Sequence, residues 1–361
     1  MKSVEVSGIR QVFELAAHLK DPVNLSIGQP HFPVPAAVKE AAKRAIDEDK
    51  SGYTITQGIP ELRSKILGDV RKKYPTKSDR ELLITSGTSG GLVLALSCVL
   101  NQGDEVIIFD PYFVMYPHFI SMAGGQAVLV DTYPDFRIDV NKVKAAITPK
   151  TKVIIVNSPA NPTGVVHDRE VLRELAVLAR ERKILLLSDE VYRAFSFDGP
   201  FASPLEFNED TLVLDGFSKA YGMTGWRLGF AHGPRRLIEE MIKLQQFTYV
   251  CAPSMVQYAG VAAWDADISG IVGDYKAKRD RLVAALKDSY EIVNPGGAFY
   301  LFPKAPWGTG SDFVAEAIRN NLLIIPGRIF SRHDTHFRLS YAASDAILDR
   351  GVEIMLRLAR R

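Results

Sequence analysis

Residues 216–229, GFSKAYGMTGWRLG, place a lone lysine, Lys219, just after the apolar run TLVLDGF and eight residues before an arginine, Arg227. Small and flexible residues separate these two cations. A surface loop would carry such a sequence for solubility alone. A binding site would carry it in order to place an amine and a guanidinium around one small anionic molecule. This segment by itself leaves both interpretations open.

Other polar and aromatic residues follow short β-rich runs in the same way. After ELLIT comes SGTSGG (86–91), whose backbone N–H groups at a helix start suit phosphate or form a plain cap. After DEVIIFD comes Phe113, which could stack on a flat ligand or pack in the core. After TKVIIVN comes Asn161, which could bind a ligand or stabilise a turn. After ILLLS come Asp189, costly to bury unless paired, and Tyr192.

A sheet is needed to bring these side chains together. Several of the β-rich runs are apolar throughout, like strands that are covered on both faces, and helical patterns lie between them. This alternation predicts an α/β fold with a mostly parallel sheet and helices on both faces. The last two runs are close enough for an antiparallel pair. Ligands of such sheets bind at the carboxyl ends of the strands. The predicted strands are 81–86, 104–110, 126–131, 151–158, 184–190, 211–217 and 227–233.

The character of the sequence changes near residue 275. A charged amphipathic helix, KAKRDRLVAALKDS, is followed by shorter strand-like runs within EIVNPGGAFYLFPKAP and THFRLSYAAS, and by a last helix at 345–360. We therefore expect a large ligand-binding domain over residues 40–275. A smaller α+β domain is expected over residues 1–39 and 276–361.

Composition excludes several classes of protein. The chain of 361 residues is 47% hydrophobic and 24% charged, which is typical of a globular chain with a sizeable core. A net charge of +2 gives no electrostatic reason to expect binding to nucleic acid or to an anionic membrane. No apolar run approaches the roughly 20 residues of a membrane helix, and the N-terminus does not resemble a signal peptide. Cys98 and Cys251, both in apolar settings, indicate buried thiols and a cytoplasmic protein.

Two histidines raise the question of a metal site. His333 and His336 stand three apart in a polar loop, HDTH. No cluster of carboxylates or cysteines accompanies them, so solvated loop histidines are favoured and no metal is expected.

The strand ends taken together point to one molecule. They present phosphate donors, an aromatic face, an amide, a carboxylate with a phenol, and a lysine with an arginine. Pyridoxal 5'-phosphate requires this whole set. Its aldehyde needs a lysine amine, its pyridinium nitrogen a carboxylate, and its phenolic oxygen neutral donors. Its phosphate needs N–H groups and an arginine, and its ring needs an aromatic face.

The segments SGTSGG, PYFVMYP, NSPANPTG, SDEVY and GFSKAYGMTGWRLG resemble, in this order, the signature of the class I/II pyridoxal-phosphate-dependent aminotransferases of fold type I. The segments SIGQPHFPVP, SGYTITQGIPELR, PGGAFYLFP and HFRLSYAAS also fit that family, in its aspartate/aromatic aminotransferase-like subgroup. The resemblance covers nearly the whole chain. It implies transfer of an amino group from an L-amino acid to a 2-oxo acid by a ping-pong mechanism between the pyridoxal and pyridoxamine forms of the cofactor.

The resemblance also implies residue roles. Lys219 would form the Schiff base and act as general acid and base. Asp189 would pair with the pyridinium nitrogen, and Tyr192 and Asn161 would bind the phenolic oxygen. The other implied cofactor-binding residues are Gly87, Thr88, Ser89, Phe113, Ser218 and Arg227.

On the substrate side, Arg338 would clamp the α-carboxylate, together with Asn161 and the backbone of Gly28. Tyr53 would reach the cofactor phosphate of a neighbouring subunit, which implies a homodimer with shared active sites. One departure from the family is Gly216, where many relatives have serine, so one phosphate hydroxyl is missing and we expect Ser218 to compensate.

Alternatives remain at this stage. A carbon–sulfur β-lyase or another pyridoxal-phosphate lyase would share the same lysine, aspartate and arginine. A non-catalytic regulatory module is disfavoured, because Met1 leads within a few residues into SGIRQVFELA. The amino donor is open as well, because Phe32, Tyr116 and Phe119 could form an apolar substrate subsite or could simply pack.

Overall fold

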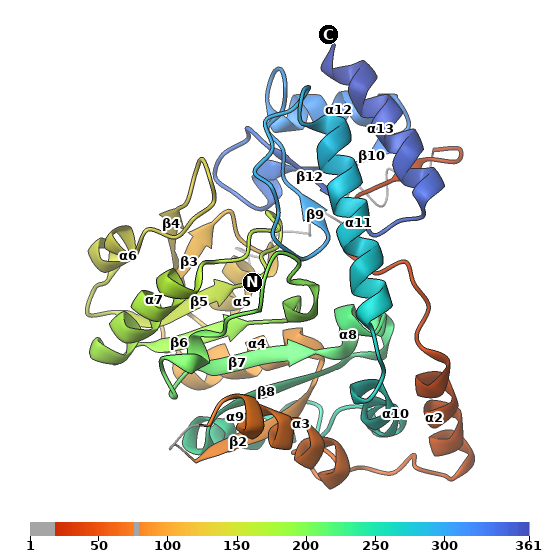
Figure 1. Ribbon diagram of the computed structural model, residues 1–361. Coiled ribbons are helices and arrows are strands. Elements are labelled where there is room, and N and C mark those ends of the chain that lie inside the picture. The colour runs from red at the N-terminus through yellow and green to blue at the C-terminus, as the bar shows by residue number, and fades with distance from the viewer. Residues whose placement is uncertain (1–18, 76–78, 361) are drawn as a thin grey trace.

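The computed structural model describes residues 19–75 and 79–360 (Figure 1). Its centre is a seven-stranded sheet in the order β2-β8-β7-β6-β5-β3-β4. β8 runs antiparallel to both of its neighbours, β2 and β7, and the other pairs are parallel. All seven predicted strands and the predicted antiparallel pair are therefore confirmed. The strands are β2 (Arg80–Ser86), β3 (Glu105–Asp110), β4 (Gln126–Asp131), β5 (Thr151–Asn157), β6 (Leu185–Asp189), β7 (Leu212–Gly216) and β8 (Leu228–Pro234).

The central strands are largely apolar because helices cover both faces of the sheet. Successive side chains of a strand point to opposite faces. Val153 and Ile155 of β5 accordingly pack with α4, α5 and α9, while Ile154 and Val156 pack with α6 and α7. The prediction of helices on both faces is confirmed. These helices are α4 (Gly87–Val99), α5 (Met115–Met122), α6 (Val140–Ala146), α7 (Arg169–Glu181) and α9 (Arg235–Thr248).

A second, smaller assembly of strands and helices lies on one side of the large sheet (Figure 1). It contains a three-stranded antiparallel sheet, β11-β12-β9, and a parallel pair, β1-β10. The predicted α+β character of the C-terminal part is therefore confirmed. Its elements are β1 (Val23–Asn24), α11 (Ser269–Leu286), β9 (Tyr300–Leu301), α12 (Gly310–Arg319), β10 (Leu322–Leu323), β11 (Ile325–Pro326), β12 (Phe337–Ser340) and α13 (Asp345–Ala359).

The domain boundaries stay predictions. The one placed between residues 39 and 40 falls within α2 (Ala36–Asp47), and the one placed between 275 and 276 falls within α11. Residues 1–18, on which the signal-peptide and regulatory-module predictions rest, lie outside the described residues. The remaining longer helices, which the sequence patterns did not predict, are α3 (Pro60–Lys73) and α10 (Ser254–Trp264).

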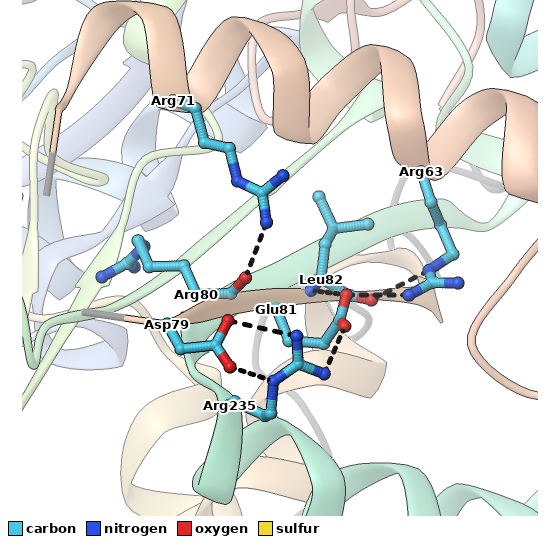
Figure 2. A network of polar contacts seen from close by, with 7 residues as sticks. All are labelled: Arg63, Arg71, Asp79, Arg80, Glu81, Leu82 and Arg235. Carbon is cyan, nitrogen blue, oxygen red and sulfur yellow. Dashed lines mark hydrogen bonds and ion pairs between the residues drawn. The ribbon is translucent and has the colours of Figure 1, made fainter. Parts of the chain in front are cut away.

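An ion-pair network fixes the edge strand β2 between two helices (Figure 2). The carboxylate of Glu81 accepts hydrogen bonds from Arg63 of α3 at 2.7 Å and from Arg235 of α9 at 3.0 Å. Arg235 also pairs with Asp79 at the start of the strand. The strand that leads into residues 86–91 is therefore held from both sides. In the described part of the chain, no helix has the length and apolar character needed to cross a membrane.

Candidate active site

A cavity of about 240 Å³ lies at the carboxyl ends of the parallel strands. Most of the predicted site residues line it, which the strand topology explains, because β2, β3, β5, β6 and β7 all end at this edge. Gly87 borders the cavity through its contact with Arg227, and Tyr53 lies elsewhere. The predicted residues that line the cavity are Gly28, Thr88, Ser89, Phe113, Asn161, Asp189, Tyr192, Ser218, Lys219, Arg227 and Arg338.

Lys219 lies in a short helical turn, α8 (Phe217–Ala220), directly after β7. Its Nζ donates a hydrogen bond of 2.7 Å to the backbone oxygen of Gly28. Burial, followed by the positive charges of Arg338 and Arg227, lowers the pKa of Lys219 to about 8, although Asp189 opposes the shift. The amine therefore loses its proton far more readily than an exposed lysine.

Asp189 ends β6 and is only 3% exposed. The hydroxyl of Tyr116 donates to its Oδ2 at 2.7 Å. Burial raises the pKa of Asp189 to about 6, and the hydrogen bond from Tyr116 opposes that shift. Tyr116 thus supports Asp189, and Phe119 packs in the core, so neither forms a substrate entrance. Phe32 packs partly buried against the core of the smaller assembly.

The loop after β2 is packed tightly against β8. Gly87 begins α4 in the left-handed region, with φ of 69°, and a Cβ there would lie 2.6 Å from Arg227 Nη2. A Cβ at Gly229 of β8 would lie 2.6 Å from backbone atoms of Gly87 and Thr88. The Oγ1 of Thr88 is buried and has no hydrogen-bond partner among the described residues. A Cβ at Gly216 would lie 3.0 Å from this same Oγ1, so Gly216 leaves room for Thr88.

Arg338, on β12, is 1% exposed and enters the cavity from the smaller assembly. Its Nη1 donates to Asn161 Oδ1 at 2.9 Å, and its Nη2 donates to the backbone oxygen of Ser26 at 2.8 Å. The guanidinium carbon lies 4.6 Å from the ring centres of both Tyr300 and Phe330. Its Nε is buried without a partner among the described residues. Burial lowers the pKa of Arg338. The N–H groups that Asn161 and Ser26 do not accept from can bind a carboxylate.

Sequence reasoning did not predict the roles of three residues that complete the site. Asn157 donates through Nδ2 to the backbone oxygen of Asp189 at 2.9 Å, and its Oδ1 accepts from the backbone of Asn161 at 2.9 Å. Tyr116 supports Asp189. The hydroxyl of Tyr300 lies 2.7 Å from the hydroxyl of Tyr192. The sequence does point to Tyr300 in one respect, because Tyr300 lies in PGGAFYLFP, one of the segments that fit the aminotransferase family.

The other predicted features lie away from this cavity. Tyr53 is 86% exposed, on a loop that Gln245 and Gln257 hold by hydrogen bonds to Thr56 and Thr54. His333 lies 3.6 Å from a carboxylate oxygen of Asp131. No group of three or more His, Cys, Asp or Glu side chains in the described ranges could hold a metal ion.

Known proteins resemble this chain over nearly its full length. Residues 20–354 match the family model for aminotransferase class I and II. A probable aspartate aminotransferase of Methanocaldococcus jannaschii is 37% identical, over 98% of this chain and 97% of its own. The aromatic-amino-acid aminotransferase 2 of Thermococcus litoralis is 33% identical, over 100% and 97%. The aspartate aminotransferase of Thermus thermophilus with maleate superimposes with a TM-score of 0.94 at 34% identity, over 99% and 98% of the two chains.

Proposed function

Because this chain belongs to the aminotransferase class I and II family, we propose that the cavity around Lys219 is its active site. The chain is a pyridoxal-phosphate-dependent enzyme that transfers an amino group from an amino acid to a 2-oxo acid. The observation that carries the proposal is the meeting of three groups in one cavity. A lysine with a lowered pKa, a buried carboxylate and a buried arginine come from three separate parts of the chain.

The residues of the cavity fit pyridoxal 5'-phosphate. The Thr88 hydroxyl has no hydrogen-bond partner among the described residues. Together with the helix start at Gly87 and the guanidinium of Arg227 it forms a donor set for a phosphate, to which Ser89 and Ser218 add hydroxyls. We assign these five residues to the phosphate end. Ser218 lines the cavity and is available to offset the hydroxyl that is missing at position 216.

The ring end of the cofactor has its own partners. Asp189 would hold the proton on the ring nitrogen, Phe113 would lie against the ring, and Tyr192 and Asn161 would donate to the phenolic oxygen. Asn161 accepts from Arg338 through Oδ1, which keeps its Nδ2 as a donor. When bound, the cofactor supplies an electron sink for the bonds of the substrate α-carbon.

We assign proton transfer to Lys219. A neutral amine can take a proton from the α-carbon of the substrate and can give a proton back. Arg338 would bind the substrate α-carboxylate, with Asn161 and the backbone of Gly28 beside it, and would so orient the α-hydrogen. Among the described residues, the cations that line the cavity are Lys219, Arg227 and Arg338, and each has a role. A dicarboxylic donor would need a further cation from outside this set.

The test is the half-reaction. Cofactor-loaded protein is mixed with one amino acid at a time and without an acceptor. Conversion of the cofactor absorbance to the pyridoxamine form should stop after one equivalent, and 2-oxoglutarate should reverse it. Continuous release of pyruvate and thiol from a cysteine conjugate would instead identify a β-lyase. A spectrum that no amino acid changes would refute the proposal, and the donor with the largest rate constant would define the substrate class.

We also propose a homodimer with shared active sites. The exposed side chains of Tyr53 and Ile55 lie on a loop anchored to α9 and α10, and Phe247, 87% exposed, lies in the last turn of α9. Apolar exposure of this kind is typical of an interface between subunits.

Subunit complementation tests that proposal. K219A and Y53A chains are coexpressed, and the dimers are isolated. If Tyr53 serves the site of the neighbouring subunit, each mixed dimer holds one wild-type site, and random pairing restores about one quarter of wild-type activity. If Tyr53 serves its own site, no activity above that of Y53A alone should return.

Two further predictions are kept as proposals. The division into a large cofactor-binding domain and a smaller domain is supported by the separate sheets. A cytoplasmic location is supported by the two unpaired cysteines, Cys98 and Cys251, since disulfides are rare in that compartment.

A further inference from the structure

Tyr300 lies between the two sets of residues that the proposed function assigns to the cofactor and to the substrate. In the antiparallel pair of β9 and β12, Tyr300 faces Ser340. Arg338 is two residues from Ser340 along β12, so its side chain shares a face of the sheet with Tyr300 as a diagonal neighbour. Tyr300 is 1% exposed and lines the cavity. The strand register therefore places one aromatic side chain against the carboxylate-binding arginine.

The ring of Tyr300 is one of two aromatic rings that contact the guanidinium of Arg338. The guanidinium carbon lies 4.6 Å from the centre of this ring and 4.6 Å from the centre of the Phe330 ring. Two hydrogen bonds, to Asn161 and Ser26, and the contacts with the two rings hold the guanidinium in place. An arginine held in this way meets a carboxylate without first losing side-chain freedom.

The hydroxyl of Tyr300 contacts the cofactor-facing phenol. It lies 2.7 Å from the hydroxyl of Tyr192, and the two phenols share one proton along that line. Burial raises the pKa of both phenols, and the positive charge of Arg338 opposes the rise in both. Either hydroxyl can act as the donor in this contact. When Tyr300 donates, the proton of Tyr192 is left to donate into the cavity, which Tyr192 lines.

We propose that Tyr300 is a positioning residue with two functions: its ring holds Arg338 for the substrate carboxylate, and its hydroxyl orients the hydroxyl of Tyr192 as a donor into the cavity. Position 28 contributes to the arrangement, because a Cβ at Gly28 would collide with the Tyr300 hydroxyl. Nothing larger than glycine fits there while this contact is kept. The proposal rests on the proposed function, which assigns the phenolic oxygen of the cofactor to Tyr192 and the α-carboxylate of the substrate to Arg338.

Two variants at position 300 separate the two functions. Tyr300→Phe keeps the ring and removes the hydroxyl, while Tyr300→Leu removes both. Tyr290→Phe is the matched control, because Tyr290 is also buried and its hydroxyl donates to the backbone oxygen of Met355 at 2.8 Å, in the core of the smaller assembly. Phe330→Leu removes the second ring that contacts Arg338, and it replaces Tyr300→Leu in the test if that variant does not fold.

The hydroxyl is tested by pH titration of the absorbance of the cofactor-loaded protein. Without the donor to Tyr192, the anionic phenolic oxygen of the cofactor loses an oriented partner. Tyr300→Phe should therefore raise the pH midpoint of the titration by about half a unit or more. Tyr290→Phe should leave the midpoint unchanged. In the background of Tyr192→Phe, adding Tyr300→Phe should produce no further shift, because the hydroxyl acts through Tyr192.

The ring is tested by calorimetry with 3-phenylpropanoate, a carboxylate without an amino group, on the cofactor-loaded protein. Tyr300→Phe should bind it as the wild type does. Tyr300→Leu and Phe330→Leu should each weaken binding by about threefold to thirtyfold, from the lost cation–π contact.

Each outcome decides one point. An unchanged titration midpoint in Tyr300→Phe, while Tyr192→Phe shifts it, would overturn the role of the hydroxyl. Unchanged carboxylate binding in both leucine variants would overturn the role of the ring. If neither Tyr192→Phe nor Arg338→Lys changed its own measurement, the assignment of those two residues in the proposed function would be wrong instead.

Discussion

Replacing Arg338 with lysine should abolish most catalysis while leaving the cofactor in place. Arg338 has five N–H groups, and Asn161 and Ser26 each take one, so Nε and one hydrogen on each terminal nitrogen remain for a substrate carboxylate. A lysine ammonium would present a single point of contact and would lack the planar guanidinium that contacts the rings of Tyr300 and Phe330.

The size of the loss follows from these contacts. One charge-assisted hydrogen bond is worth ~1.5–3 kcal/mol. The cation–π contacts of the buried guanidinium add ~0.5–2 kcal/mol. The sum is ~2–5 kcal/mol, so kcat/KM should fall by about thirtyfold to a few thousandfold.

The assay is stopped-flow measurement of the half-reaction with phenylalanine and with aspartate. Both should lose a similar factor, because the lost contact is to the α-carboxylate that all amino acids share. The absorbance of the bound cofactor should not change. Arg281→Lys, at an exposed ion pair with Asp345, is the control and should behave as the wild type. A defect confined to aspartate would refute the reasoning and would make Arg338 a reader of the side chain.

Three further predictions concern the cofactor side. Lys219→Ala should remove the absorbance of lysine-linked cofactor and lower turnover by orders of magnitude, whereas Lys243→Ala, at an exposed site, should do neither; near wild-type turnover in the first variant would exclude Lys219 as the catalytic amine. Asp189→Asn should fold, since Tyr116 can donate to an amide oxygen, but should lose about 10²–10³ in kcat; unchanged turnover would remove its role at the ring nitrogen. The pKa of Lys219, about 8, makes the amine neutral above that pH. The rate at which the cofactor-free protein binds the cofactor should therefore rise up to about pH 8 and then level off. The rate for a free lysine derivative, measured by the same absorbance, should continue to rise at higher pH. Identical profiles for the two amines would contradict the lowered pKa.

The sequence could predict which side chains lie at the strand ends, because each of them follows its own strand within a few residues. Asp189 closes β6, and Lys219 follows β7 by three residues. Once the runs are recognised as parallel strands, their ends must meet at one edge, and the cavity is a consequence of topology. The helix patterns at α7 and α9 were readable for a similar reason, since each shows its apolar face locally.

The supporting residues could not be predicted in this way because their partners are remote. Tyr116 meets Asp189 across 73 residues, and Tyr300 meets Tyr192 across 108. An aromatic residue in an apolar run has the same local pattern whether it fills the core or aims a hydroxyl at a neighbour. The sequence accordingly leaves Tyr116 open as part of a substrate subsite, whereas in the structure it is buried and its hydroxyl donates to Asp189.

The close contact between Gly229 and the backbone of Gly87 and Thr88, here called the glycine contact, limits which positions of this enzyme can accept a substitution. β8 is hydrogen-bonded to β2 on one side and to β7 on the other, so it cannot withdraw to accept a side chain at position 229. Mutational scanning should find this wall of the cavity almost invariant. The opposite wall is formed by side chains of the short strands β9 and β12 and by the loop around Gly28. Libraries that seek new amino donors should leave the glycine contact intact, together with Gly28, Tyr300 and Arg338, and vary other side chains that line the cavity.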